Sequence, residues 1–176
     1  ALTSAGKVIA WGRNDFAQCV VPEEAQSNII GIGCGSYHSL AIKNDGTVLA
    51  WGLEAFGATY VPIGLKDVYM IDGGYGHTLA LKNDGTLVVW GVQTTDFGGL
   101  QNFGQAIIPK KWKWERFIHI ACGHSFNVAL TRQHTVFIWG SNEYNQRRPP
   151  EVLEDVYFIS AGKGHIMAIL PPIESQ

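Results

Sequence analysis

The dipeptide Trp-Gly occurs four times in this chain of 176 residues, at positions 11–12, 51–52, 90–91 and 139–140. Successive tryptophans are 40, 39 and 49 residues apart. Repeats of about 20 to 50 residues are typical of solenoids and propellers, in which each unit buries its apolar face against its neighbours. The spacing therefore predicts an array of similar units that follow one another along the chain.

The copies agree at positions beyond Trp-Gly. The residue five places before each tryptophan is Gly6, Gly46, Gly85 or His134, and the residue thirteen places before the last three tryptophans is His38, His77 or Phe126. A proline follows eleven places after three of the tryptophans but nineteen places after Trp90, at Pro109. The third connection therefore contains about eight additional residues within 92–104.

Each copy has the pattern of short strands. Residues 29–34 are apolar and β-branched, residues 38–43 form a second predicted strand, and residues 47–51 return antiparallel to it after Asn44-Asp45-Gly46, a predicted type I′ hairpin turn. Residues 48–51 and 87–90 lack the polar alternation of a sheet with one wet face, so we expect them to be buried on both faces. The sequence predicts an all-β fold: a β-propeller of four-stranded blades, with about four blades in a single unit spanning 1–176.

Residues 35–52, from Gly-Ser-Tyr-His to Thr-Val-Leu-Ala-Trp-Gly, resemble the repeat of the regulator of chromosome condensation family. Residues 14–18 and 142–146 are similar to the Asn-x-x-Gly-Gln loop of that family, with Ala17 and Asn145 in place of its glycine. The resemblance implies a ring of roughly seven blades. Four blades would then be an arc: a fragment, or part of a ring that a partner or self-association completes.

The functions implied by the resemblance are diverse, because one fold carries many functions. The family includes exchange factors for small GTPases, ubiquitin-ligase modules, a plant ultraviolet receptor and a secreted β-lactamase inhibitor. We predict a non-catalytic protein–protein interaction scaffold. The alternatives are a guanine-nucleotide exchange factor for a small GTPase and a propeller-type inhibitor of a secreted hydrolase.

Charge, hydrophobicity and cysteine content indicate which kinds of partner and which compartment to expect. The net charge of −2 gives the chain no overall attraction to nucleic acid, which is therefore not the expected partner. The charge is uneven, however, because residues 110–148 hold seven of the 13 basic side chains and only two acids. No run approaches the ~18 apolar residues of a membrane span. The three cysteines cannot all pair within the chain, which favours a reducing, intracellular compartment.

The histidines and cysteines do not form a recognisable reactive motif. His38, His77 and His165 recur at one blade position, and equivalent positions lie apart around a ring, so we interpret them as structural. His119 and His124 flank Cys122, but Cys122 aligns with Cys34, which has no such histidines. We expect no catalytic residue, metal or cofactor.

Residues 110–116 differ in composition from the aligned segments of the other copies. Aromatic and basic side chains alternate in this stretch, and such side chains are typical of protein interfaces. On an extended segment both tryptophans would share one face, with lysines on the other; alternatively, the rings pack into the blade edge beneath lysine stems. The predicted partner-binding residues are Trp112, Trp114, Lys110, Lys111, Lys113 and Arg116, together with Asp96 and Phe97 in the long connection.

Overall fold

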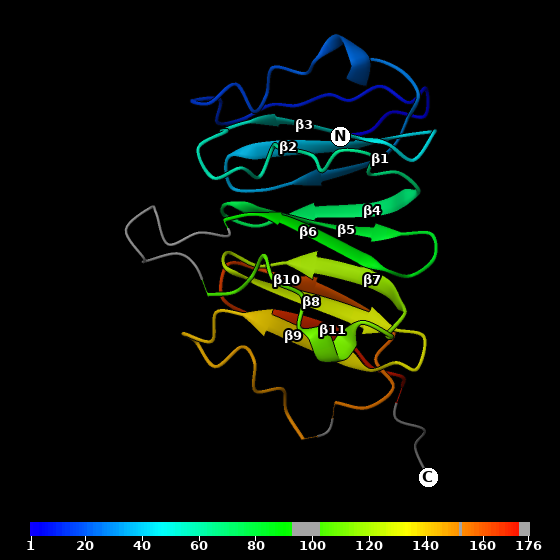
Figure 1. Cartoon of the computed structure of the whole chain (residues 1–176), viewed down its shortest axis with the longest axis vertical. Coiled ribbons are helices and arrows are strands. Elements are labelled where there is room, and N and C mark those ends of the chain that lie inside the picture. Colours follow the sequence, from blue (N-terminus) through cyan, green and yellow to red (C-terminus); the bar gives the residue numbers. More distant parts are fainter. Residues whose placement is uncertain (93–102, 152, 173–176) are drawn as a thin grey trace.

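The computed structural model describes residues 1–92, 103–151 and 153–172. Its strands form four antiparallel sheets that follow one another in chain order. Figure 1 shows the first three stacked along the long axis of the molecule, with the fourth overlapping the third in this view. Within each sheet the strands are neighbours in sequence, so every sheet is a local meander. This arrangement confirms the predicted all-β propeller and its arc of blades.

We name the sheets blades A to D in chain order. Blades A, B and C each end at a Trp-Gly pair, whereas Trp11-Gly12 precedes blade A and blade D contains no such pair. Blade A comprises β1 (Ile29–Cys34), β2 (His38–Lys43) and β3 (Val48–Gly52); blade B comprises β4 (Val68–Gly73), β5 (His77–Lys82) and β6 (Leu87–Gly91). Blade C comprises β7 (Phe117–Cys122), β8 (Phe126–Thr131) and β9 (Val136–Gly140), and blade D comprises β10 (Phe158–Ala161) and β11 (Ile166–Ile169). A single bridge between Leu2 and Val8 precedes blade A. Two short 3₁₀ helices, η1 (Glu23–Ala25) and η2 (Lys110–Trp112), complete the elements of the described residues.

The blades have fewer strands than the sequence predicted. Blades A, B and C each have three strands rather than four. In the described connections, the segments after Trp-Gly form turns and 3₁₀ helices instead. Prolines contribute to this difference because they donate no backbone hydrogen bond: Pro22 and Pro109 are the N-caps of η1 and η2.

The hairpin turn at residues 44–46 has a different geometry from the one predicted. Gly46 has φ +77°, whereas Asn44 and Asp45 have no positive φ. A type I′ turn requires two successive residues with positive φ, so this is a type I turn followed by a left-handed glycine. Asp45 accepts hydrogen bonds from the backbone and hydroxyl of Thr47, at 2.9 and 2.6 Å, which fix the turn.

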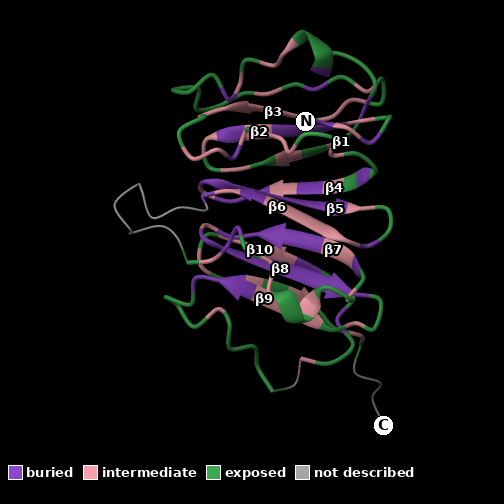
Figure 2. Cartoon of the chain, in the orientation of Figure 1, coloured by how far each residue is buried: buried purple, intermediate pink, exposed green. Residues whose placement is uncertain are grey.

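The core lies between blades rather than within one sheet. Leu40 and Ile42 of β2 pack with Val68 and Ile71 of β4, and an equivalent cluster joins blades B and C. The middle strand of each three-stranded blade is the most buried, and Figure 2 shows the buried residues concentrated in the interior of the stack. The expectation that the third strands are buried on both faces is wrong: β3 and β6 are mostly half-buried, because they lie farther out on the blade.

Within the described parts of the chain, the structure has no helix long and apolar enough to cross a membrane.

Candidate protein-binding surfaces

The turns that join the first and second strands of the blades are linked into a ladder. The backbone N–H of Ser36 donates to the carbonyl of Gly74 at 3.0 Å, and that of Tyr75 donates to the carbonyl of His124 at 2.8 Å. The N–H of His124 continues the ladder to Lys163 at 3.1 Å. These turns and the loops after Trp-Gly lie at the same end of the strands in each blade, along one side of the stack, which we call the loop face.

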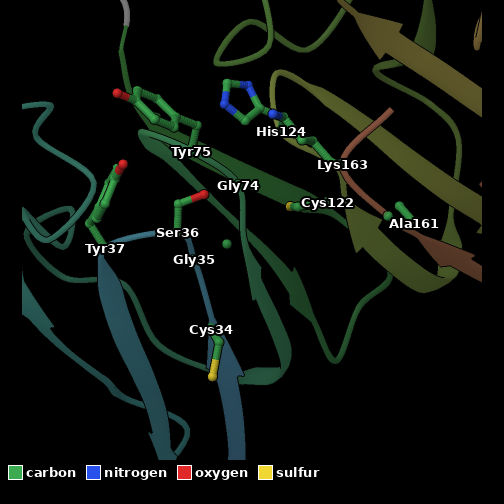
Figure 3. Close-up of a pocket in the computed structure, with 13 residues that line it drawn as sticks. Cys34, Gly35, Ser36, Tyr37, Gly74, Tyr75, Cys122, His124, Ala161 and Lys163 are labelled. Carbon is green, nitrogen blue, oxygen red and sulfur yellow. The ribbon is translucent and has the colours of Figure 1, made fainter. Parts of the chain in front are cut away.

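A cavity of about 460 Å³ opens among the same turns. Figure 3 shows Tyr37, Tyr75 and His124 projecting from successive turns beside this cavity. Glycines form much of its lining, including Gly35, Gly74, Gly123 and Gly162. The cavity is therefore lined largely by backbone and has aromatic side chains on its rim.

The loops after Trp-Gly each present an aromatic side chain on this face. In three of these four loops a glutamine two residues further on holds the loop, because its side-chain oxygen accepts a hydrogen bond from the backbone N–H of the aromatic residue. The pairs are Phe16 with Gln18 at 2.9 Å, Phe103 with Gln105 at 2.7 Å, and Tyr144 with Gln146 at 2.9 Å. In blade A the corresponding aromatic residue is Phe56.

The aromatic side chains of the two loop types meet. The ring centroids of Phe16 and Tyr37 are 5.3 Å apart, those of Tyr37 and Tyr75 are 5.4 Å apart, and those of Tyr75 and His124 are 4.5 Å apart. Phe56 lies 5.2 Å from Tyr75. Tyr144 lines a smaller cavity with His124 and Lys163. We call this set the aromatic belt: Phe16, Tyr37, Phe56, Tyr75, His124 and Tyr144.

Two of the three repeated histidines, His38 and His77, lie beneath the loop face and connect blades, whereas His165 is exposed. The Nε2 atom of His38 is 3.0 Å from Oγ1 of Thr78 in the next blade, and Thr78 in turn donates to the carbonyl of Ala58. Because the hydroxyl proton of Thr78 is used in this second bond, His38 is the donor in the first. Burial lowers the pKa of His38 and of His77 to about 4. Both are neutral side chains that join blades.

The residues from His119 to His124 do not converge. The His119 ring packs against Phe158 with centroids 4.3 Å apart, whereas His124 stacks on Tyr75. The Cys122 thiol is buried, and burial raises its pKa. Across residues 1–92, 103–151 and 153–172, no group of three or more His, Cys, Asp or Glu side chains could hold a metal ion.

The predicted stretch 110–116 has a different conformation from the one expected. Residues Lys110–Trp112 form η2, and Lys113 is also right-handed helical, so the two tryptophans do not share one face of an extended segment. Trp112 packs against Phe137 and Trp139 with centroids 5.0 and 5.7 Å apart. Trp114 is 79% exposed. Trp112 therefore packs into the edge of the blade, as in the alternative considered from the sequence, whereas Trp114 does not.

The remaining predicted residues divide into two groups. Lys110, Lys111, Lys113 and Arg116 surround Trp114 in sequence and none of them is buried. Asp96 and Phe97 lie outside the described residues.

Two features of these surfaces were not predicted. The aromatic belt was missed, although Phe16, Phe56, Phe103 and Tyr144 occupy aligned positions after Trp-Gly. Arg132 lies close to Arg116 in the structure, where the two residues line the same cavities. Their separation by fifteen other residues in sequence hid this proximity.

Comparison with known proteins places two segments in a described repeat family. Residues 29–58 and 117–146 match the "Regulator of chromosome condensation (RCC1) repeat". In an alignment of 217 positions, the chain is 28% identical to the human E3 ubiquitin-protein ligase HERC2, and the alignment covers 96% of this chain and 4% of HERC2. A second alignment, of 67 positions, is 43% identical to Protein pim1 of Schizosaccharomyces pombe and covers 31% of this chain and 12% of pim1.

Solved structures show the same fold. Prp20p of Saccharomyces cerevisiae, described with its binding properties to Gsp1p and histones, superimposes with a TM-score of 0.72 at 19% identity, over 98% of this chain and 54% of Prp20p. Human WBSCR16 gives a TM-score of 0.71 at 18% identity, over 97% of this chain and 55% of WBSCR16. The chain thus spans about half the length of these solved proteins and a small part of the curated relatives.

Proposed function

Because the chain is a β-propeller segment of the regulator of chromosome condensation repeat family, we propose that it is a non-catalytic protein-interaction module that binds its partner with the loop face. Loops held on a rigid scaffold commonly carry binding function. The fold-related Prp20p is described as binding proteins, Gsp1p and histones. A protein partner is the corresponding proposal for this chain.

The aromatic belt carries this proposal. Its rings come from loops of successive blades, and contacts between the rings, turn-to-turn hydrogen bonds and glutamine side chains hold them in place. Partly exposed aromatic side chains with few accessible conformations lose little entropy on binding and are enriched at interface hot spots. The adjoining cavity gives the belt a concave centre.

The test is quantitative capture of partners from native lysate with the wild-type chain and with Tyr144→Ala. Tyr144 is 65% exposed on the loop face, so its truncation should reduce partner recovery without lowering the melting temperature. The matched control is Tyr157→Ala. Tyr157 is 57% exposed and contacts His134 in the β8–β9 hairpin turn, at the other end of the blade.

Selective loss of a captured protein with Tyr144→Ala supports binding through the loop face. Equal recovery by wild type, Tyr144→Ala and a Phe16→Ala/Tyr144→Ala variant, all folded, contradicts it. A purified captured partner can then be titrated against the three proteins to give dissociation constants. Truncation of a hot-spot aromatic side chain should weaken binding by about 2 kcal/mol.

A further inference from the structure

A second surface lies at the opposite end of the blades, which we call the hairpin face because it carries the turns between the second and third strands. Arg116 precedes β7, and Arg132 follows β8 in the turn to β9. Both arginines line two neighbouring cavities, one of about 310 Å³ and one of about 510 Å³. The length of β8 separates this surface from the loop face.

The smaller cavity has an aromatic wall. Trp114 and Phe137 both line it, and Phe137 is held edge-on against Trp112 and Phe117. Trp114 is 79% exposed, and the Nζ atom of Lys113 lies 5.2 Å from its ring centroid. An apolar side chain inserted here would cover surface that water now contacts.

The two arginines are available for an anion. Among the residues that the structure describes, neither has a carboxylate within ion-pair distance. Arg116 donates a hydrogen bond from Nη1 to the backbone carbonyl of Glu115 at 2.9 Å. The other N–H groups of its guanidinium can therefore bind an anion. Lys110, Lys111 and Lys113 add positive charge around Trp114.

Two acidic side chains limit what can bind. Glu115 lines the smaller cavity and Asp84 lines the larger one. Oδ1 of Asp84 accepts hydrogen bonds from the backbone and hydroxyl of Thr86, which keep the carboxylate at the wall. The positive charge is therefore concentrated at the arginines between the cavities and is interrupted on either side.

We propose that this surface, which we call the arginine groove, binds an extended acidic segment of a partner protein: an apolar or aromatic side chain enters beside Trp114 and Phe137, and adjacent carboxylates pair with Arg116 and Arg132. The planar guanidinium group matches the geometry of a carboxylate. A single-stranded nucleic acid also combines anionic charge with stacking groups. Its phosphates are continuous, however, and would meet Asp84 and Glu115, whereas a peptide can restrict its carboxylates to the arginines.

The experiment is fluorescence polarisation with the whole chain and three labelled probes of similar length. The first is a peptide with one phenylalanine flanked by glutamates, the second replaces the glutamates by glutamines, and the third is oligothymidylate. We expect the acidic peptide to bind at least tenfold more tightly than either of the others. Its affinity should fall as salt rises.

Variants locate the site. Arg132→Gln and Trp114→Ala should each weaken binding of the acidic peptide about tenfold, while Lys163→Gln on the loop face should leave it unchanged. Unaltered melting temperatures establish that the variants are folded. Equal binding of the acidic and neutral peptides, tighter binding of oligothymidylate, or equal affinity of wild type and Arg132→Gln would each overturn the proposal. None of these outcomes depends on the loop face.

Discussion

The Nε2 atom of His77 in blade B lies 2.9 Å from Oδ1 of Asn127 in blade C. One blade further on, the residues at the same two positions are Phe126 and Ile166, which belong to one apolar cluster. The Phe126 ring also lies over Gly123, as the His77 ring lies over Gly74. The polar pair is thus replaced as a unit by an apolar pair, and the two positions form one inter-blade contact.

This replacement predicts coupling between the two sites. His77→Phe alone leaves the oxygen of Asn127 without its histidine donor and should cost about 1–3 kcal/mol of unfolding free energy. His77→Phe combined with Asn127→Ile should recover at least about 1 kcal/mol relative to the sum of the single variants. Urea unfolding of the four proteins measures this coupling energy. Additive losses would show that the positions are independent.

The buried histidines predict a loss of stability in acid. The pKa values of His38 and His77 fall to about 4 in the folded chain because burial disfavours the charged ring. Both rings are neutral in the folded state, so the unfolded chain binds more protons between pH 6.5 and pH 4. Stability is therefore fully present above the unfolded pKa and decreases as pH falls towards about 4. Each histidine should remove about 2 kcal/mol between about pH 7 and pH 5.

The control for this pH dependence is the His77→Phe/Asn127→Ile variant, which should lose the share of the slope due to His77. The comparison is necessary because burial raises the pKa of Asp72, and a raised carboxyl pKa stabilises the folded state as pH falls. An unchanged slope in the variant would contradict the assignment to His77.

The glycine beneath each of these rings predicts a steric effect. A Cβ atom at Gly74 would lie 2.1 Å from Cε1 of His77 and 2.7 Å from the carbonyl oxygen of Gly123. Gly74→Ala should therefore cost about 3 kcal/mol, since ring and backbone must both move. Gly12→Ala is the control: Gly12 has φ +108°, but a Cβ atom there would meet nothing within 4 Å, so only conformational strain of about 1 kcal/mol is expected. Thermal unfolding distinguishes the two effects.

The two neighbouring tryptophans should differ in their effects on stability. Trp112→Ala removes contacts with Phe137 and Trp139 and should lower the unfolding free energy by about 2 kcal/mol, less than for a fully buried tryptophan. Trp114→Ala should change it by less than about 0.5 kcal/mol, because its ring is exposed. Comparable destabilisation by both would mean that Trp114 is also a packing residue.

These residues show what the sequence could predict. The interval between Trp-Gly pairs was sufficient to predict the propeller. The recurrence of histidine at one blade position was sufficient to predict that His38 and His77 are structural. Both predictions depend on repetition along the chain. The arginine groove depends on Arg116 and Arg132, which approach only after β7 and β8 pair. The conformation around Trp112 depends on a local helical turn after Pro109, which alternation of residue types does not reveal. Repeated features were therefore more predictable than features confined to one copy.

An exposed apolar face on blade D leads to a further prediction. Met167 and Ile169 are 62% and 59% exposed, whereas the corresponding Leu40 and Ile42 of blade A are each 1% exposed beneath blade B. We propose that, in the 176-residue chain by itself, this face associates with a second copy, since large exposed apolar patches promote association. Sedimentation should show oligomers whose proportion rises with concentration, and Met167→Glu should reduce it. A monomer at every concentration would contradict this proposal.

The turn-to-turn ladder on the loop face also has a consequence for how the chain opens. Ser36, Tyr75 and His124 each donate to the turn of the next blade, so a blade in the middle of the ladder is held from both sides and a terminal blade from one side. An array with only nearest-neighbour contacts opens from its ends. Amide hydrogen exchange should therefore be slowest in β5 and β8 and become faster towards β11 and the Leu2–Val8 bridge. The molecule would then be most rigid near Tyr75 and more adaptable towards either end of the belt.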